Sequence, residues 1–262
     1  MRDQNILKKI VDAAKLTKKD TVLEVGPGEG LLTALLLERA GSVVAVEKDD
    51  RLIPALTEKF KEEIAAQKLE LIHGDILTLD TKRYTLNAKR YSIVANLPYY
   101  ITGQFLRKFL SAEYQPSSMT LLLQKEVVNR IMARDKKESI LSISVKCYGT
   151  PRSIGTVKAG AFSPPPKVDS AILAIEEISK RFFEDEGKAK PFLARFRLSE
   201  AEFFQTLKRG FAHPRKLLAS NLGLSASARI ILAECGVAPK ARAEEITLAQ
   251  WRAITSLTHE RP

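Results

Sequence analysis

The stretch Thr21–Gly41, TVLEVGPGEGLLTALLLERAG, runs from a short apolar segment through three closely spaced glycines into a longer apolar segment. Residues 21–25 have the apolar, β-branched character of a buried strand, and residues 31–40 have helical spacing. Glycines between a strand and a helix let the backbone approach a ligand, and the first N–H groups of the helix are free to bind it. The stretch therefore predicts the first strand, binding loop and helix of an α/β sheet, with Gly41 as the helix C-cap.

The next 140 residues continue this alternation of apolar runs and amphipathic segments. Helical spacing is expected before the first strand, over residues 6–16, and after the second, over residues 50–67. The further expected strands are SVVAVEKD (42–49), LELIHGDIL (69–77), YSIVANLPYY (91–100), SMTLLLQ (118–124) and a closing pair at 151–160 and 170–178. Residues 139–148 fit either a strand or a helix. The alternation predicts a parallel sheet with helices on both faces.

Beyond residue 180 the pattern changes. A charged connector, RFFEDEGKAK, is followed by helical periods that are interrupted at Gly223 and Gly236, and no strand-like run follows. We therefore expect two domains, a ligand-binding α/β domain over residues 1–180 and a small helical domain over residues 181–262.

Composition and charge limit the class of protein. No apolar run approaches the roughly 18 residues of a membrane span, and Cys147, Cys235 and three scattered histidines lack metal-ligand spacing. We expect a cytoplasmic protein without a disulfide framework or a metal site. The net charge of +11 is uneven, with −3 over residues 1–81 and +10 over residues 82–160. Such a basic region suggests a polyanionic partner such as nucleic acid, although lysines can also serve solubility alone.

Three acidic residues follow or end successive strands. The glycine spacing differs from the dinucleotide fingerprint, and Glu24, before the glycine loop, suits an ammonium group better than a pyrophosphate. Glu47, about twenty residues on, can accept from both hydroxyls of a ribose, and Asp75 can accept from an adenine amino group. Glu47 could instead be a solvated charge, and Asp75 an N-cap. Together the three residues fit S-adenosylmethionine, which has an ammonium, a ribose and an adenine.

The stretch VANLPYYITG places an amide, Asn96, at the end of the fourth expected strand, followed by Pro98 and two aromatic residues. One interpretation is a strand that ends in a proline turn. The other is a clamp for a flat ring that carries an amino group. We expect Tyr100 to be a packing residue.

The order of VLEVGPGEGLLT, VEKD, GDIL, NLPYYIT, LLLQKEVVNRI and FSPPPKVDSAIL resembles the small-subunit rRNA adenine N6,N6-dimethyltransferases (KsgA type), nearly end to end. The resemblance implies a class I, Rossmann-like S-adenosylmethionine-dependent methyltransferase sheet with a small all-helical C-terminal domain. It implies transfer of two methyl groups to each of two adjacent adenosines of small-subunit rRNA, with S-adenosylhomocysteine as product. The implied partner is the immature small ribosomal subunit. We expect the protein to be a monomer.

The resemblance also assigns residues. The implied catalytic residues are Asn96, Leu97, Pro98, Tyr99 and Phe162. The implied cofactor-binding residues are Glu24, Gly26, Gly28, Glu47, Lys48, Asp75, Ile76 and Asn96. The implied RNA-binding residues are Lys125, Arg130, Lys167, Lys208, Arg209, Arg215 and Lys216. Without the resemblance, Phe162 would be interpreted as a core residue beneath the proline loop.

The sequence departs from the family pattern at two places. Ala212, His213 and Pro214 stand in a stretch that is usually more polar and basic. Family members usually carry Gln-His-Phe before the residues that match DQNIL, whereas this sequence begins at Met1, so we expect weaker cofactor binding. Three alternatives stay open: methylation of large-subunit rRNA adenine, methylation of DNA adenine, and an assembly or nucleic-acid-binding factor on the same fold that does not need catalysis.

Overall fold

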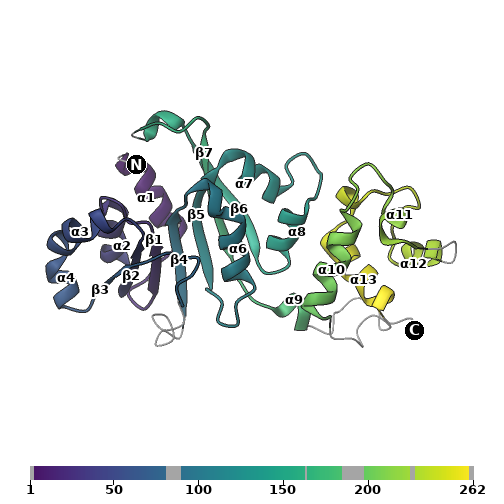
Figure 1. Cartoon of the computed structure of the whole chain (residues 1–262), viewed down its shortest axis with the longest axis horizontal. Coiled ribbons are helices and arrows are strands. Elements are labelled where there is room, and N and C mark those ends of the chain that lie inside the picture. Colours follow the sequence, from purple (N-terminus) through teal and green to yellow (C-terminus); the bar gives the residue numbers. More distant parts are fainter. Residues whose placement is uncertain (1–2, 81–89, 163, 185–197, 225–227, 260–262) are drawn as a thin grey trace. The chain divides into compact units, whose positions relative to one another are not determined.

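The computed structural model describes residues 3–80, 90–162, 164–184, 198–224 and 228–259 (Figure 1). The chain forms two compact units, each with its own core. The first comprises residues 1–128 and 149–178, and the second comprises residues 129–148 and 179–262. The structure thus groups residues 129–148, which the sequence division had assigned to the first domain, with the helical unit.

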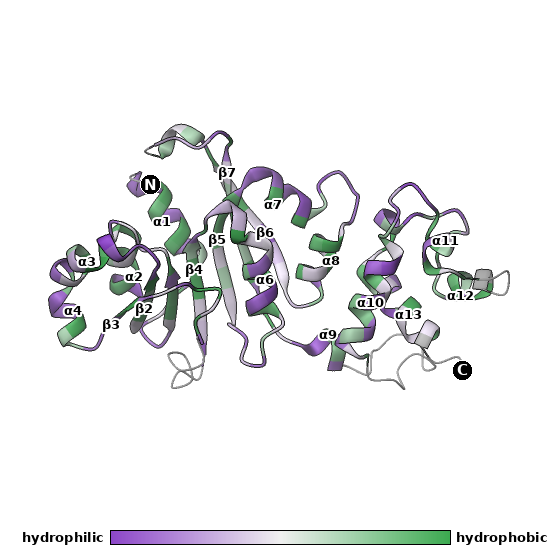
Figure 2. Ribbon diagram, in the orientation of Figure 1, coloured by the Kyte–Doolittle hydropathy of each residue, from purple (hydrophilic) through white to green (hydrophobic). Residues whose placement is uncertain are grey.

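Within the described residues, the first unit is built on a seven-stranded sheet with the order β3-β2-β1-β4-β5-β7-β6. The strands are β1 (Thr21–Val25), β2 (Ser42–Glu47), β3 (Leu69–His73), β4 (Tyr91–Asn96), β5 (Ser118–Gln124), β6 (Thr150–Val157) and β7 (Ser170–Glu176). The first five strands along the chain pair in parallel, and β7 is antiparallel to both β5 and β6. The central strands are apolar along most of their length, as a parallel sheet covered on both faces requires (Figure 2).

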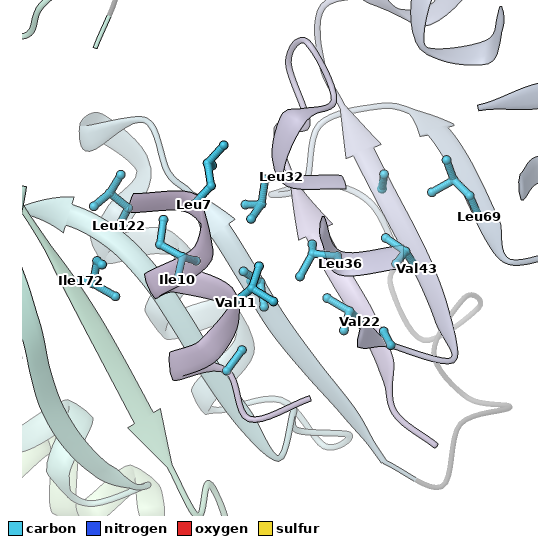
Figure 3. Packing of buried hydrophobic residues seen from close by; sticks show 14 of the residues in the cluster. Leu7, Ile10, Val11, Val22, Leu32, Leu36, Val43, Leu69, Leu122 and Ile172 are labelled. Atoms are coloured by element: carbon cyan, nitrogen blue, oxygen red, sulfur yellow. The ribbon is translucent and has the colours of Figure 1, made fainter. Parts of the chain in front are cut away.

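The helices of the first unit precede β1 or connect the strands. They are α1 (Gln4–Ala13), α2 (Leu31–Arg39), α3 (Ile53–Lys59), α4 (Lys61–Ala65), α6 (Thr102–Leu110) and the start of α7 (Lys125–Met132), whose residues from 129 on belong to the second unit, with single 3₁₀ turns η1 (Asp50–Leu52), η2 (Tyr99–Ile101) and η3 (Ala159–Ala161). Helix α1 begins at the cap Asp3, whose side chain accepts from two backbone N–H groups. Its buried stripe of Leu7, Ile10 and Val11 packs with α2 and with the apolar side chains of one sheet face (Figure 3).

The second unit is helical. Its elements are α8 (Ile140–Lys146), α9 (Arg181–Glu184), α10 (Glu200–Gly210), α11 (Leu218–Leu222), α12 (Ala228–Glu234), η5 (Ala243–Glu245) and α13 (Leu248–His259). Trp251 of α13 is fully buried and stacks on Phe211 at a centroid distance of 5.6 Å. Gly210 allows this packing, because a Cβ there would lie 2.2 Å from the Trp251 ring.

Two expectations about helices are settled by the backbone. Residues 140–146 are helical, and the helix begins with a capping box formed by Ser139 and Ser142. The helix expected over residues 50–67 is instead interrupted at Phe60, between α3 and α4.

The expected cap role of Gly41 is wrong. Gly41 follows α2 but is not among the glycines with positive φ. A side chain is excluded there by close backbone approach, because a Cβ would lie 2.4 Å from the Lys18 carbonyl oxygen.

Candidate active site

The register brings the predicted site residues of three strands to one edge of the sheet. Val25, the last residue of β1, lies level with Val46 of β2 and Ala95 of β4. Glu47 and Asn96 are each the next residue, so they flank the start of the glycine loop from the two sides. This edge, at the carboxyl ends of parallel strands, is where open α/β sheets bind ligands.

The glycine loop has a backbone that other residues would strain. Gly26, Gly28 and Gly30 have φ values of 70°, 59° and 74°, in the left-handed region that side chains disfavour. A Cβ on Gly26 or Gly28 would meet nothing within 4 Å, whereas one on Gly30 would lie 2.5 Å from the Phe60 ring. The first two glycines therefore border open space, and the third is a packing position.

Glu47 is held by the backbone. Its Oε2 accepts from the Gly28 N–H at 3.0 Å, and its Oε1 accepts from the N–H groups of Lys48 and Asp49 at 2.8 and 2.9 Å. These three bonds fix the carboxylate between β2 and the glycine loop. A carboxylate has about four acceptor positions, so one remains for a further donor.

Glu24 is fully buried, and neither carboxylate oxygen has a hydrogen-bond partner among the described residues. The hydroxyl of Thr33, on α2, is also buried and forms no hydrogen bond with any residue in the described ranges. Burial raises the pKa of Glu24 to about 8; the nearby Thr33 hydroxyl offsets part of the rise, and the charge of Glu47 adds to it. A buried carboxylate without a donor is costly when charged, so this position calls for a proton or a cationic ligand.

Asp75 lies two residues past the end of β3 and pairs with Lys48. The Lys48 ammonium donates to Oδ2 at 2.8 Å, and the Leu77 N–H donates to Oδ1 at 2.9 Å. The Lys48 bond, followed by the Leu77 bond, lowers the pKa of Asp75. Ile76, next to Asp75, is buried.

Asn96 is partly exposed at the end of β4, and no side-chain hydrogen bond engages its amide within the described part of the chain. Leu97 after it is buried, at 2% exposure. Pro98 then begins the η2 turn, in which the Ile101 N–H donates to the Pro98 carbonyl at 3.2 Å. Asn96 thus lies between the end of β4 and a turn that begins with proline, and both restrict the position of its amide.

The two tyrosines of this turn differ. Tyr99 is half-buried, and its hydroxyl shares a 2.9 Å hydrogen bond with the hydroxyl of Ser170 at the start of β7. Tyr100 is 80% exposed. The expectation that Tyr100 packs is therefore wrong, because the turn directs its ring to solvent.

Phe162 is half-buried and packs against the apolar cluster under α1. It follows η3, and the Phe162 N–H donates to the Ala159 carbonyl at 3.2 Å. Pro164 and Pro165 beyond it are exposed. Phe162 thus packs on the core and is also partly exposed. This is compatible with a core residue beneath the proline loop and with the catalytic residue that the resemblance implies.

Comparison with known proteins decides the family. A sequence model described as ribosomal RNA adenine dimethylase matches residues 1–258. The chain belongs to the ribosomal RNA adenine dimethylase family. A dimethylase-family protein from Dehalococcoides mccartyi, named ribosomal RNA small subunit methyltransferase A, is 42% identical over 256 residues, which cover 96% of this chain and 83% of that protein. A protein of the same name from Clostridium botulinum is 32% identical over 264 residues, with coverages of 98% and 90%.

Solved structures of two other enzymes have a similar fold. The 23S rRNA methyltransferase ErmE matches with a TM-score of 0.76 and 26% identity, over 98% of this chain and 99% of that one. A dimethyladenosine transferase from Plasmodium falciparum matches with a TM-score of 0.77 and 24% identity, over 97% and 95%. The predicted Rossmann-like methyltransferase fold is confirmed, and family and fold imply S-adenosylmethionine as the methyl donor of this dimethylase.

The predicted RNA-binding residues of the dimethylase are distributed over both units. Lys125 and the exposed Lys167 belong to the first unit, whereas the other five predicted residues belong to the second. Lys208, Arg215 and Lys216 are exposed. Arg209 has a structural bond as well, since its guanidinium donates to the Leu222 carbonyl at 2.6 Å.

Two groups that shape the site were not apparent from the sequence. Ser170 was inside the quoted FSPPPKVDSAIL segment, but a serine at the start of a strand carries no sign of a partner 71 residues away. Lys108 donates to the carbonyls of Leu77 and Leu79 at 3.1 and 2.5 Å, and burial lowers its pKa. It thereby holds the segment after Asp75, and its helical surroundings gave no signal of this.

The structure also bears on membrane-spanning helices and metal sites. None of the helices in the described ranges is long and apolar enough to cross a membrane. Among the same residues, no three His, Cys, Asp or Glu side chains are grouped as metal ligands.

Proposed function

We propose that this dimethylase transfers methyl groups from S-adenosylmethionine to the N6 amino groups of two adjacent adenosines in small-subunit rRNA. The product is N6,N6-dimethyladenosine, made on the immature small subunit in the cytoplasm by a monomeric enzyme. The name shared by the relatives from Dehalococcoides mccartyi and Clostridium botulinum supports the choice of small-subunit rRNA.

The observation that carries the proposal is the Asn96 amide beside the glycine loop, which forms no side-chain hydrogen bond with the residues that the structure describes. Its oxygen is an acceptor at the edge where Glu24, Glu47 and the loop also meet. An adenine amino group has two hydrogens and a nitrogen lone pair delocalised into the ring. Acceptors for those hydrogens, rather than a strong base, make the lone pair available for attack.

The residues of the first unit fit S-adenosylmethionine. The buried carboxylate of Glu24 accepts no hydrogen bond from the described residues, which suits the ammonium of the cofactor. Gly26 and Gly28 border open space that a side chain would fill. Glu47 retains acceptor capacity for ribose hydroxyls, and Asp75, with Ile76 and Lys48 beside it, would accept from the adenine amino group.

In this proposal the Asn96 side-chain oxygen and the Leu97 carbonyl accept hydrogens from the target amino group. The ring of Pro98 fixes its backbone φ angle and so restricts the conformation of the turn, so these acceptors are ordered before the substrate arrives. Tyr99 and Phe162 would hold the extruded adenine, since base–aromatic stacking returns about 1–3 kcal/mol of the unstacking cost. When bound, the cofactor supplies an electrophilic methyl group and leaves as S-adenosylhomocysteine. Positioning of the amino nitrogen by these residues is the largest contribution of the protein.

Methylation of large-subunit rRNA is the second candidate, because ErmE, a 23S rRNA methyltransferase, has the same fold over nearly its whole chain. The test is transfer of labelled methyl groups to immature small subunits, to large subunits and to DNA in parallel. We expect label in small-subunit rRNA as dimethyladenosine at two adjacent positions. Label confined to large subunits or DNA would refute the proposal, and binding to small subunits without transfer would favour a non-catalytic assembly factor.

A further inference from the structure

The start of β7 contacts the turn that contains Tyr99. Ser170 is fully buried, and its hydroxyl shares a 2.9 Å hydrogen bond with the Tyr99 hydroxyl, so either group can donate. This side-chain bond joins the turn after β4 to β7, two strands that are not neighbours in the sheet because β5 lies between them. A bond at the tip of a half-buried ring limits the orientations of that ring.

The segment that holds Ser170 is itself fixed by its neighbour Asp169. The Asp169 carboxylate accepts from the Lys158 ammonium and from the Ala159 N–H, each at 3.1 Å. The Asp169 carbonyl accepts from the Lys125 N–H at 3.0 Å. These bonds close the base of the loop that contains Phe162. Ser170 therefore projects from a backbone position that is tied to both η3 and α7.

We infer that Ser170 is a positioning residue for methyl transfer, because its hydroxyl orients the Tyr99 ring against the target adenine. The inference rests on the proposed function, in which Tyr99 stacks on the base. Ser170 itself contacts no substrate in this scheme. Its contribution is to fix the orientation of the Tyr99 ring before RNA binds, so that less conformational entropy is lost when the complex forms. A misplacement of about 1 Å of a positioning group can cost about 100-fold in rate.

The test is a double-mutant cycle of Ser170→Ala, Tyr99→Phe and the double variant, measured as kcat and KM for methyl transfer to immature small subunits. We expect each single variant to lower kcat about 5- to 100-fold, with the KM for S-adenosylmethionine unchanged. The double variant should be no slower than the slower single variant, since both changes break the same bond.

Ser92→Ala is the matched control. Ser92 is buried in the same sheet, at the opposite end of β4, and its hydroxyl bonds the Ser118 hydroxyl at 2.9 Å. Its loss should lower the unfolding free energy as Ser170→Ala does while leaving kcat unchanged. A wild-type kcat for Ser170→Ala, effects that multiply in the double variant, or an equal kcat loss in Ser92→Ala would each overturn the inference.

A readout without catalysis separates this inference from the proposed function. In ¹³C-tyrosine-labelled protein, the Tyr99 ring signal is identified by its absence in Tyr99→Phe. We expect Ser170→Ala to shift or broaden this signal and Ser92→Ala to leave it in place. An unmoved signal refutes the positioning role even if transfer occurs. A moved signal in a protein that methylates no small subunits supports the positioning of the ring and refutes the proposed substrate.

Discussion

The burial of Glu24 leads to a quantitative prediction for Glu24→Gln. The cofactor-free protein should bind a proton on this side chain at neutral pH, because burial raises its pKa from 4.5 to about 8. The unfolded chain would release that proton near pH 4.5. The native state therefore binds more protons than the unfolded state between these values, and its stability must fall as the pH rises from about 4.5 to 8.

The size of the effect follows from the shift. About 3.5 pKa units at 1.36 kcal/mol each make an unfolding free-energy loss of about 4–5 kcal/mol across that window. The nearly isosteric Gln cannot titrate, so Glu24→Gln lacks this contribution while it retains the other titrating groups. The difference between the two proteins should thus be constant below pH 4 and should change by about 4–5 kcal/mol in favour of the variant by pH 8.

Urea unfolding of both proteins at several pH values measures this difference. Equal pH profiles would refute the reasoning, because they would mean that Glu24 is ionised in the folded protein at neutral pH. An acidic group elsewhere cannot produce the difference, since it is common to both proteins.

The same proton should be released when S-adenosylmethionine binds, if Glu24 accepts from its ammonium. At pH 7 a group of pKa about 8 is about 90% protonated, so wild type should release about 0.9 proton more than Glu24→Gln does. Calorimetry in buffers of different ionisation enthalpy measures this release. At pH 9 the excess should nearly vanish, and an equal release by both proteins at pH 7 would exclude the ammonium contact.

The remaining predictions concern the target site, the glycine loop and the charge. Asn96→Ala should lower methyl transfer by about 100-fold or more, by analogy with the loss of one preorganised polar group, while filter binding shows nearly unchanged affinity for small-subunit rRNA; a parallel loss of binding would make Asn96 structural. Gly28→Ala should lower the unfolding free energy by about 1–2 kcal/mol, because alanine is strained at the positive φ of this position, and it should weaken cofactor binding. Gly30→Ala should lower the unfolding free energy by about 1–3 kcal/mol more, because its Cβ would overlap the Phe60 ring. Urea unfolding measures both losses. With a net charge of +11, the affinity for rRNA should fall steeply between 50 and 200 mM salt, and a flat salt titration would contradict the role of the basic residues.

Several features of this protein were already determined by local sequence. The fifth expected strand, residues 118–124, has the same bounds as β5, because a buried parallel strand needs an uninterrupted apolar run. The glycine loop was recognisable because only glycine adopts the positive φ values at residues 26, 28 and 30 without strain. The location of the site at one edge of the sheet followed from the parallel order of the strands, since polar residues at the ends of parallel strands gather at the same edge.

Other features were decided only by tertiary structure. Residues 139–148 had no decisive period, and their helix depends on a local cap together with packing in the helical unit. The sequence around Tyr100 gave no sign that its ring would be 80% exposed. Position 41 requires glycine because the Lys18 carbonyl, from another segment, leaves no room for a side chain.

The chemistry of the site is the clearest case of this division. The sequence places a carboxylate at position 24, but its raised pKa comes from full burial in the folded protein. Likewise, the bond between Tyr99 and Ser170 joins residues 71 positions apart. Residue type and strand order are encoded locally, whereas burial and long-range hydrogen bonds exist only after the sheet has formed, and they set the protonation of Glu24 and the orientation of the Tyr99 ring.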